Sequence, residues 1–548
     1  MGAGEVGHDY DALIVGAGFA GLYMLHRLRQ AGFRARVLEA GDGIGGVWFW
    51  NRYPGARCDI ESTQYSYQFS PELEQEWCWS ERYATQAEIL SYANHVADRF
   101  DLRGDIELET RVVAARFDER ARIWQLTSQD GRQFSSRFVI MATGCLSVPT
   151  WPRIPGISSF AGEVHHTGTW PREGVGFEGK RVAVIGTGSS AIQSIPVIAR
   201  EARHVTVFQR TPAYTVPARN IALPPSVLTG IKAIYRQLRA RAKQMPTGVL
   251  FDSSTEQATE ASPERRAREY ERRWQRGGLT FLSAYSDILT DAEANRTAAD
   301  FVRAKIRGIV KDPAVAERLM PTTPIGAKRL CVDLGYYETF NRENVTLVDV
   351  SAAPIERISE GGVVAGGALH ACDIIVLATG FDAMTGALMR IDIEGRGGLS
   401  LAQTWAAGPR TYLGLAIHGF PNLFTITGPG SPSVLTNMLP SIEQHVEWIA
   451  DCMIVLRQRG IAAIEATADA ENAWVAHVAE EARHTLRAVG SSWYVGANVP
   501  GKPQVFMPYA GGVPKYAQTC EEVAARGYEG FALTCTDAAA GPREETPA

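Results

Sequence analysis

Two glycine-rich turns, each lying between a predicted strand and a predicted helix, constrain the fold more than any other feature of the sequence. The first occupies residues 16–21 (G-A-G-F-A-G) and the second residues 186–191 (G-T-G-S-S-A). A short apolar run precedes each turn, at 11–15 and at 181–185, as expected for buried strands. Glycines in this setting let the backbone approach a pyrophosphate at a helix N-terminus. The pair predicts an α/β chain with two Rossmann-like dinucleotide-binding domains; a plain glycine turn is the alternative for the first copy.

The two copies differ at the end of their second predicted strand. In the first copy, strand 35–38 is followed by Glu39, whose carboxylate can accept hydrogen bonds from ribose hydroxyls. In the second copy, strand 205–208 is followed by Arg210 and by no acid. A guanidinium binds a phosphate through two hydrogen bonds, whereas a carboxylate would repel it. We therefore expect FAD on the first copy and NADPH on the second, with a solvated arginine as the alternative interpretation of Arg210.

Paired apolar runs and a charged stretch suggest how the chain divides. Runs ending in Ala-Thr-Gly at 138–144 and 374–380 are typical of the strand that closes each nucleotide domain in flavoproteins with two dinucleotides. We expect residues 1–150 and 381–548 to form an FAD-binding domain, and residues 151–220 and 328–380 an NADP-binding domain. Residues 221–327, rich in Arg, Ala, Glu and Leu, predict a helical insertion with a charged, solvated face. Residues 537–548 are small and polar and predict a loose tail.

Composition argues against several other classes of protein. Lys and Arg number 55 and Asp and Glu number 60, so the chain has no basic field for nucleic acid or anionic lipid. No apolar run is long enough to cross a bilayer, and the first residues lack the apolar run of a signal peptide. None of the eight cysteines stands in a C-x-x-C pair, which argues against a metal site. We expect a cytoplasmic monomer or weak homo-oligomer without a nucleic-acid or membrane partner.

Two longer patterns flank the glycine turns. Residues 160–171 (F-A-G-E-V-H-H-T-G-T-W-P) match F-x-G-x-x-x-H-x-x-x-W-P, and residues 45–59 (G-G-V-W-F-W-N-R-Y-P-G-A-R-C-D) match G-G-x-W-x-x-x-x-Y-P-G-x-x-x-D. Both are signatures of type I Baeyer–Villiger monooxygenases, which the chain resembles from about residue 11 to about residue 534, most of all in the phenylacetone and steroid monooxygenase branch. The resemblance implies a flavoenzyme that uses NADPH and O2 to convert aryl, alicyclic or steroid-like ketones to esters or lactones through a flavin C4a-peroxide.

The resemblance also implies roles for individual residues. Arg329, in residues 326–333 (G-A-K-R-L-C-V-D), resembles the active-site arginine that stabilises the flavin peroxide and the charged adduct, a task that needs a fixed cation. Lys328 would bind the NADPH 2′-phosphate together with Arg210. Asp59 would pair with Arg329 and set its position. The alternatives are an ordinary loop arginine for Arg329 and a helix N-cap for Asp59. We expect His166 to link the domains and not to transfer protons.

Further implied contacts concern the cofactors and the substrate. Residues 491–502 resemble a mobile loop that folds over bound NADP+, with Trp493 on the nicotinamide nucleotide. Ser433, Val434, Leu435 and Met438 match a loop that lines the substrate pocket, and their uncharged side chains suit an aromatic or alicyclic ketone. Core packing is the alternative for Trp48 and Tyr65. The complete set of expected cofactor contacts is Gly16, Gly18, Gly21, Glu39, Gly46, Val47, Trp48, Arg57, Asp59, Tyr65, Val112, Gly186, Thr187, Gly188, Ser189, Ser190, Gln193, Arg210, Thr211, Lys328, Arg329, Met438 and Trp493.

Three other functions are alternatives to ketone oxidation. An N- or S-hydroxylating flavin monooxygenase shares the two folds, but the terminal Trp-Pro of the 160–171 signature and the pairing of Arg329 with Asp59 argue against it. An NADPH–disulfide reductase would need a redox cysteine pair near the flavin. A flavin-binding regulator without turnover would show no ketone-stimulated NADPH consumption.

Overall fold

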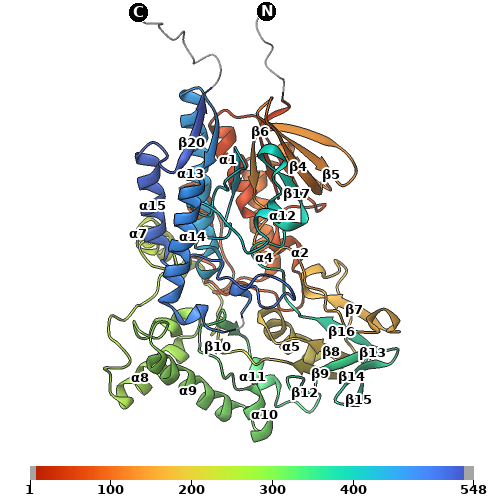
Figure 1. Ribbon diagram of the computed structural model, residues 1–548. Coiled ribbons are helices and arrows are strands. Elements are labelled where there is room, and N and C mark those ends of the chain that lie inside the picture. Colours follow the sequence, from red (N-terminus) through yellow and green to blue (C-terminus); the bar gives the residue numbers. More distant parts are fainter. Residues whose placement is uncertain (1–7, 491, 536–548) are drawn as a thin grey trace, which may run out of the picture.

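Two sheets of mainly parallel strands organise the computed structural model, which describes residues 8–490 and 492–535 (Figure 1). The expected tail at 537–548 lies outside the described residues, as does Ser491. Each sheet carries one of the two glycine turns at the carboxyl end of a central strand. The prediction of two Rossmann-type units in an α/β chain is therefore confirmed.

The first sheet has the strand order β17-β4-β5-β6-β1-β2-β3, with β18 paired to β6. Strands β1, β2, β3, β6 and β18 pair in parallel, whereas β4–β5 and β5–β6 are antiparallel. Side chains pack on both faces of the parallel part, so the apolar residues 12–15 of β1 are buried and the central residues Leu13 and Ile14 are fully buried. The bounds are β1 Tyr10–Val15, β2 Ala35–Leu38, β3 Ile106–Glu107, β4 Val112–Asp118, β5 Ile123–Ser128, β6 Gln133–Met141, β17 Asp392–Glu394 and β18 Leu423–Thr425.

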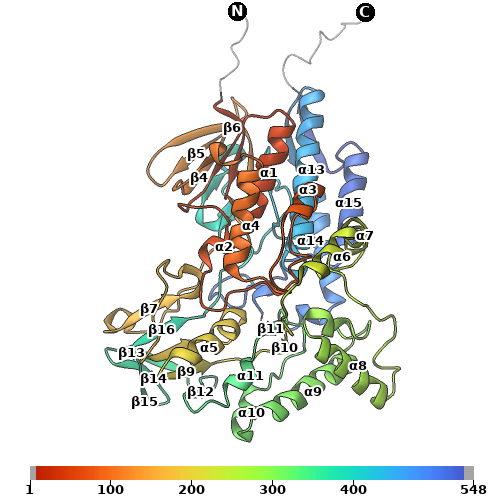
Figure 2. The same ribbon diagram turned by 180° about the vertical axis from the view of Figure 1, so that it is seen from behind.

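Helices from both ends of the chain surround the first sheet. The crossover helix α1 follows the first glycine turn, and the long helix α13 from the C-terminal third packs beside it (Figure 2). Helices α14 and α15 and the antiparallel pair β19–β20 complete this side. The bounds are α1 Phe19–Gln30, α2 Val47–Trp50, α3 Pro71–Glu76, α4 Gln86–Arg99, α12 Leu401–Thr404, α13 Met438–Gln458, α14 Ala468–Arg483, α15 Val513–Ala525, β19 Ile461–Ala466 and β20 Phe531–Cys535.

The second sheet has the order β12-β9-β8-β16-β7, and all its pairs are parallel. Helix α5 follows the second glycine turn. A separate three-stranded antiparallel sheet, β13-β14-β15, lies beside the second sheet. The bounds are β7 Glu163–His166, β8 Arg181–Ile185, α5 Ser189–Glu201, β9 His204–Gln209, β12 Val345–Asp349, β13 Ile355–Ser359, β14 Gly362–Ala365, β15 Ala368–Ala371 and β16 Ile374–Leu377.

Residues 221–327 contain five α-helices and the 3-10 helix Leu279–Ser283, and both views place α8–α10 beside α11 and the short parallel pair β10–β11 (Figures 1 and 2). Ser262, Asp291 and Asp312 cap α8, α9 and α10 by accepting backbone N–H bonds. The charged face of α8 is not wholly solvated, because Arg273 is buried and donates to Glu269 at 2.7 Å. The bounds are β10 Thr215–Pro217, α6 Pro225–Ala233, α7 Tyr235–Lys243, α8 Pro263–Arg276, α9 Ala292–Ile309, α10 Pro313–Leu319, β11 Cys331–Asp333 and α11 Tyr336–Thr339.

Two chain segments connect the sheets, at 142–150 and at 378–384, and we call them the crossing segments. They run side by side: the Asp382 N–H donates to the Val148 carbonyl and the Met384 N–H to the Cys145 carbonyl, both at 2.8 Å. Pro149 and Phe381 form an antiparallel bridge between them. A change in the relative position of the two sheets must therefore pass through these paired segments.

Among the residues that the structure describes, no helix has both the length and the apolar character that crossing a bilayer requires.

Candidate active site

The first glycine turn is held tightly by neighbouring backbone. Gly16 has a φ of +107°, and a Cβ there would lie 2.6 Å from the Ala142 carbonyl oxygen. A Cβ on Gly21 would overlap the carbonyl oxygen of Gly16. Glu39, almost fully buried, accepts the Ala17 N–H at 2.6 Å and the Gly41 N–H at 2.8 Å. Burial raises the pKa of Glu39, and the N–H donors oppose that rise. The carboxylate therefore fixes the turn itself, in addition to the expected ribose contact.

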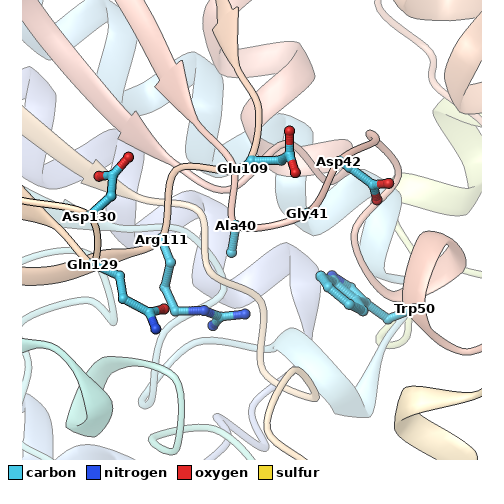
Figure 3. A pocket seen from close by; sticks show the side chains of 8 residues that line it. All are labelled: Ala40, Gly41, Asp42, Trp50, Glu109, Arg111, Gln129 and Asp130. Carbon is cyan, nitrogen blue, oxygen red and sulfur yellow. The ribbon is translucent and has the colours of Figure 1, made fainter. Parts of the chain in front are cut away.

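A polar cavity opens immediately after Glu39, and Figure 3 shows its wall. Its volume is ≈ 520 Å³, and the Arg111 and Trp50 side chains point toward each other across it. Val112, an expected cofactor contact, follows Arg111 at the start of β4. No sequence motif indicated this cavity, because its lining comes from four separate segments. The lining residues are Ala40, Gly41, Asp42, Trp50, Glu109, Arg111, Gln129 and Asp130.

The start of the 45–59 signature packs onto the first glycine turn. A Cβ on Gly18 would lie 3.4 Å from the Cα of Gly46, so the two backbones are in near contact. Val47 and Trp48 begin α2 directly after Gly46. The Trp48 indole N–H donates to the Tyr65 hydroxyl at 3.0 Å, and the two rings meet edge to face. These expected flavin contacts therefore lie together beside the turn.

The second glycine turn is tight at one glycine and open at the other. Gly186 has a φ of +115°, and a Cβ there would overlap the Ala378 carbonyl oxygen. By contrast, apart from its two neighbours in the chain, no described residue has an atom within 4 Å of the Cβ position of Gly188. The Thr187 hydroxyl donates to the Thr211 carbonyl at 2.8 Å and fixes the turn to the strand end that carries Arg210. Side chains of the described residues therefore do not fill the space beside Gly188.

Lys328 and Arg210 approach one another although 117 residues separate them in sequence. Burial lowers the pKa of Lys328, and the positive charge of Arg210 lowers it further. Within residues 8–490 and 492–535, neither side chain has an ion-pair or hydrogen-bond partner. Two neighbouring cations without a counter-charge are an arrangement that can bind a dianion such as a phosphate monoester.

Arg329 and Asp59 form a bidentate ion pair across 270 positions of sequence. The Nε and Nη2 groups donate to Oδ2 and Oδ1 of Asp59 at 2.5 and 2.9 Å, and Nη1 donates to the Val434 carbonyl at 2.7 Å. The Arg329 side chain is 24% exposed and that of Asp59 is 22% exposed. Burial acts to lower the pKa of Arg329, but the carboxylate outweighs it and holds that pKa above its ordinary value. No helix begins at Asp59, so the N-cap alternative is wrong.

Contacts with α5 place Asp59 where Arg329 can reach it. The Tyr53 hydroxyl donates to Oε1 of Gln193 at 2.8 Å, and the Gln193 amide nitrogen donates to the Arg57 carbonyl at 3.0 Å. Gly55, with a φ of +80°, lies against the Gln193 carbonyl. The Arg57 side chain pairs with Glu81 at 2.7 Å. Gln193 and Arg57, both expected at a cofactor, are thus engaged with the protein here, and their cofactor contacts stay a prediction.

The expected substrate loop and the expected mobile loop pack together. Ser433, Val434 and Leu435 form a buried 3-10 turn, and Met438 begins α13 next to it. One apolar cluster joins this turn to Trp493 in the 492–502 segment. Two members of the cluster, Cys145 and Met384, were missed from the sequence because no motif contains them.

His166 occupies the link between the sheets as a neutral side chain. It is fully buried, and burial lowers its pKa to about 4. Its Nδ1 accepts the Gly168 N–H at 2.9 Å, so the proton lies on Nε2, which is 3.2 Å from the Thr379 hydroxyl. The two ring nitrogens therefore contact residues that follow β7 and β16, which are neighbouring strands of the second sheet, and the role of His166 in linking the domains stays a prediction.

Comparison with known proteins places these features in a family. A model described as pyridine nucleotide-disulphide oxidoreductase matches residues 13–274. A Baeyer–Villiger monooxygenase of Pseudooceanicola batsensis is 42% identical over 95% of this chain and 96% of its own. An acetone monooxygenase (methyl acetate-forming) of Gordonia sp. strain TY-5 is 43% identical over 96% of this chain and 99% of its own. The solved structure of an oxidized steroid monooxygenase bound to NADP is 52% identical, with a TM-score of 0.92 over 96% of this chain and all of that one.

The cysteines do not supply the dithiol that disulfide reduction requires. All eight are free in the structure, and six of them are buried. Burial raises the pKa of Cys331 to about 11, and Cys58 and Cys145 beside the Arg329 site have raised pKa values for the same reason. Thiols held protonated in this way are poor nucleophiles.

Proposed function

The chain belongs to the Baeyer–Villiger monooxygenase family, and from that membership we propose that it uses FAD, NADPH and O2 to convert uncharged aryl, alicyclic or steroid-like ketones to esters or lactones. The observation that carries the proposal is the Asp59–Arg329 ion pair hydrogen-bonded to the buried 433–435 turn. It holds a permanent, fixed cation beside a buried apolar cluster, and a fixed cation is what the charge developing in a carbonyl addition needs.

The residues of the chain suit both dinucleotides. FAD would be held by the first turn, Glu39, the Gly46–Trp48 backbone, Tyr65 and the cavity next to Val112, since a buried acceptor and a polar cavity suit a ribose and an adenine. NADPH would lie on Gly188, with its 2′-phosphate on Arg210 and Lys328. Bound FAD, reduced by NADPH, supplies the activation of O2. The proposed contacts on the NADPH side also include Gly186, Thr187, Ser189, Ser190, Thr211 and Trp493.

Arg329 would stabilise the negative charge that develops on the substrate carbonyl oxygen. Of the five N–H groups of a guanidinium, three donate to Asp59 and to the Val434 carbonyl. The remaining two have no partner in the described part of the chain and can donate to the substrate. Asp59 orients the guanidinium and keeps its charge paired, because a carboxylate binds it in a planar, two-bond geometry. The apolar cluster with Trp493 and Tyr494 would exclude water from the reacting atoms.

The organisation of the molecule supports the division proposed from the sequence. The strands of the first sheet come from residues 10–141 and 392–425, and those of the second from residues 163–209 and 345–377. We assign FAD to the first unit, NADPH to the second and the helices of 221–327 to an insertion. Eight free thiols suit the reducing cytoplasm, and we propose a monomer or weak homo-oligomer, which sedimentation of the purified protein would test.

The proposed function is tested by a ketone panel scored for ester or lactone by mass spectrometry. Acyclic, aryl, alicyclic and steroid ketones are incubated with the enzyme, NADPH and O2, beside a sulfide and a tertiary amine. We expect ester or lactone from at least one ketone class. Formation of sulfoxide and N-oxide without ester from any ketone would support the hydroxylating rival instead.

The contrast between Gly186 and Gly188 provides a test of NADPH placement. Gly188→Ala should fold normally, since its φ of −83° suits alanine and its Cβ meets no protein atom, but it should raise the KM for NADPH about tenfold or more because the Cβ enters the cofactor cradle. Gly186→Ala should instead lose ~1 kcal/mol or more of stability, since its φ is positive. Thermal unfolding and NADPH kinetics measure both effects. An unchanged KM in Gly188→Ala would place the cofactor elsewhere.

A further inference from the structure

The segment 492–502 is attached to one crossing segment by two side chains. The Lys502 ammonium donates to Oδ1 of Asp382 at 2.6 Å and to the Ala383 carbonyl at 2.7 Å. The Asn498 amide donates to the Phe381 carbonyl at 2.7 Å. The Lys502 side chain is only 10% exposed, whereas that of Asp382 is 29% exposed. The contact is therefore a largely buried ion pair and not a solvated surface pair.

The same segment is braced internally, so that its attachment governs its position. The Ala497 N–H donates to the Ser492 carbonyl, and the Lys502 N–H to the Val499 carbonyl. Just beyond the segment, the Met507 N–H donates to the Tyr494 carbonyl at 3.0 Å. Trp493 and Tyr494 belong to the same compact turn as Lys502, so we expect them to move with it, and they form one wall of the apolar cluster over Val434 and Leu435.

We propose that Lys502 is a positioning residue that closes segment 492–502 over the Arg329 site by attaching it to Asp382 on the connection between the two sheets. Asp382 is itself fixed by its N–H bond to the Val148 carbonyl in the opposite crossing segment. Closure consequently depends on the arrangement of the crossing segments, which changes whenever the two sheets move relative to one another. The consequence for turnover rests on the proposed function; the attachment itself does not.

Charge and burial explain why this pair controls closure. If Asp382 loses its charge, a lysine ammonium at a 10% exposed position retains only the Ala383 carbonyl as a strong partner. A buried cation without a counter-charge is unfavourable, so the side chain moves to water and takes the segment with it. Loss of one charge-assisted hydrogen bond of this kind shifts an opening equilibrium about tenfold.

The test compares Lys502→Met and Asp382→Asn with the wild type by hydrogen exchange and mass spectrometry of the cofactor-loaded protein. Lys502→Met keeps the aliphatic stem, and Asp382→Asn keeps an acceptor of the same shape. We expect exchange in residues 492–502 to rise about tenfold in both, with the strands of the first sheet unchanged. With ketone present, a larger fraction of the consumed NADPH should yield hydrogen peroxide in place of ester. The kcat for NADPH oxidation should change by a smaller factor than this peroxide fraction does.

The matched control is Lys515→Met, since Lys515 forms an ion pair with Glu481 at 2.5 Å but is 54% exposed. It should leave both the exchange of 492–502 and the peroxide fraction at wild-type values. The exchanged pair Lys502→Asp with Asp382→Lys should restore part of the protection. Unchanged exchange in both single variants, or an equal rise in the Lys515 control, would overturn the proposal. Exchange is measured without turnover, so a failure of the proposed function would show separately as absence of ester from the wild type.

Discussion

Arg329→Ala should abolish ester formation from ketones while reduction of the bound flavin by NADPH continues. The variant removes a cation that keeps two N–H groups without a partner in the described chain, and loss of such a fixed donor costs about 3 kcal/mol or more in the transition state, a factor of at least about a hundred in rate. Hydride transfer to the flavin does not use that charge. Stopped-flow absorbance measures flavin reduction, and mass spectrometry measures the ester.

Two further variants separate charge from geometry at this position. Arg329→Lys keeps a positive charge but cannot bind Asp59 through two parallel bonds, and we expect activity between those of the wild type and the alanine variant. Asp59→Asn keeps the side-chain shape but leaves the Arg329 guanidinium unpaired, and it should lower ester formation without affecting flavin binding. A normal ester yield from Arg329→Ala would remove this residue from the mechanism.

Arg210→Ala should raise the KM for NADPH by roughly tenfold to a hundredfold and leave the KM for NADH nearly unchanged. The expected size is that of one or two hydrogen bonds to a charged phosphate, and NADH has no 2′-phosphate to lose them. Steady-state kinetics with both nucleotides measures the ratio. Equal effects on the two would show that Arg210 does not bind the phosphate.

Lys328 adds a pH dependence to the same preference. Burial and the charge of Arg210 lower the pKa of Lys328, so in the free enzyme it loses its proton at a lower pH than an ordinary lysine. As the pH is raised, the KM for NADPH should therefore begin to increase at a lower pH than the KM for NADH. In Lys328→Arg, where the side chain stays charged, this rise should disappear. In Arg210→Ala it should move to higher pH, because the repelling charge is gone.

Sequence patterns predicted the parts of the site that depend on local backbone. The glycine turns, Glu39 and Arg210 each lie within one strand–turn–helix unit, where spacing alone fixes their relation. The 45–59 signature was informative because its Tyr53 and Gly55 must fit α5. The pairing of Asp59 with Arg329 followed from the family resemblance, since no local rule relates positions so far apart.

The parts of the site that the sequence did not predict depend on contacts between segments that are distant in sequence. The wall of the polar cavity comes from loops after β2, before β4 and after β5 and from α2, none of which has a motif of its own. Lys502 and Asp382 are ordinary charged residues until the crossing segment brings them together. For the same reason, the sequence could not show that the side chains of Arg57 and Gln193 pair with distant residues of the protein.

Turnover under isotopically heavy O2, with a ketone that yields ester in ordinary air, shows whether this chain inserts one atom of O2 beside the carbonyl of a ketone. We predict that each ester molecule gains one heavy oxygen atom, in the new ester linkage, and that the carbonyl oxygen keeps its natural isotope. Ester without the heavy atom, or heavy oxygen found only in hydrogen peroxide and water, would contradict the claim.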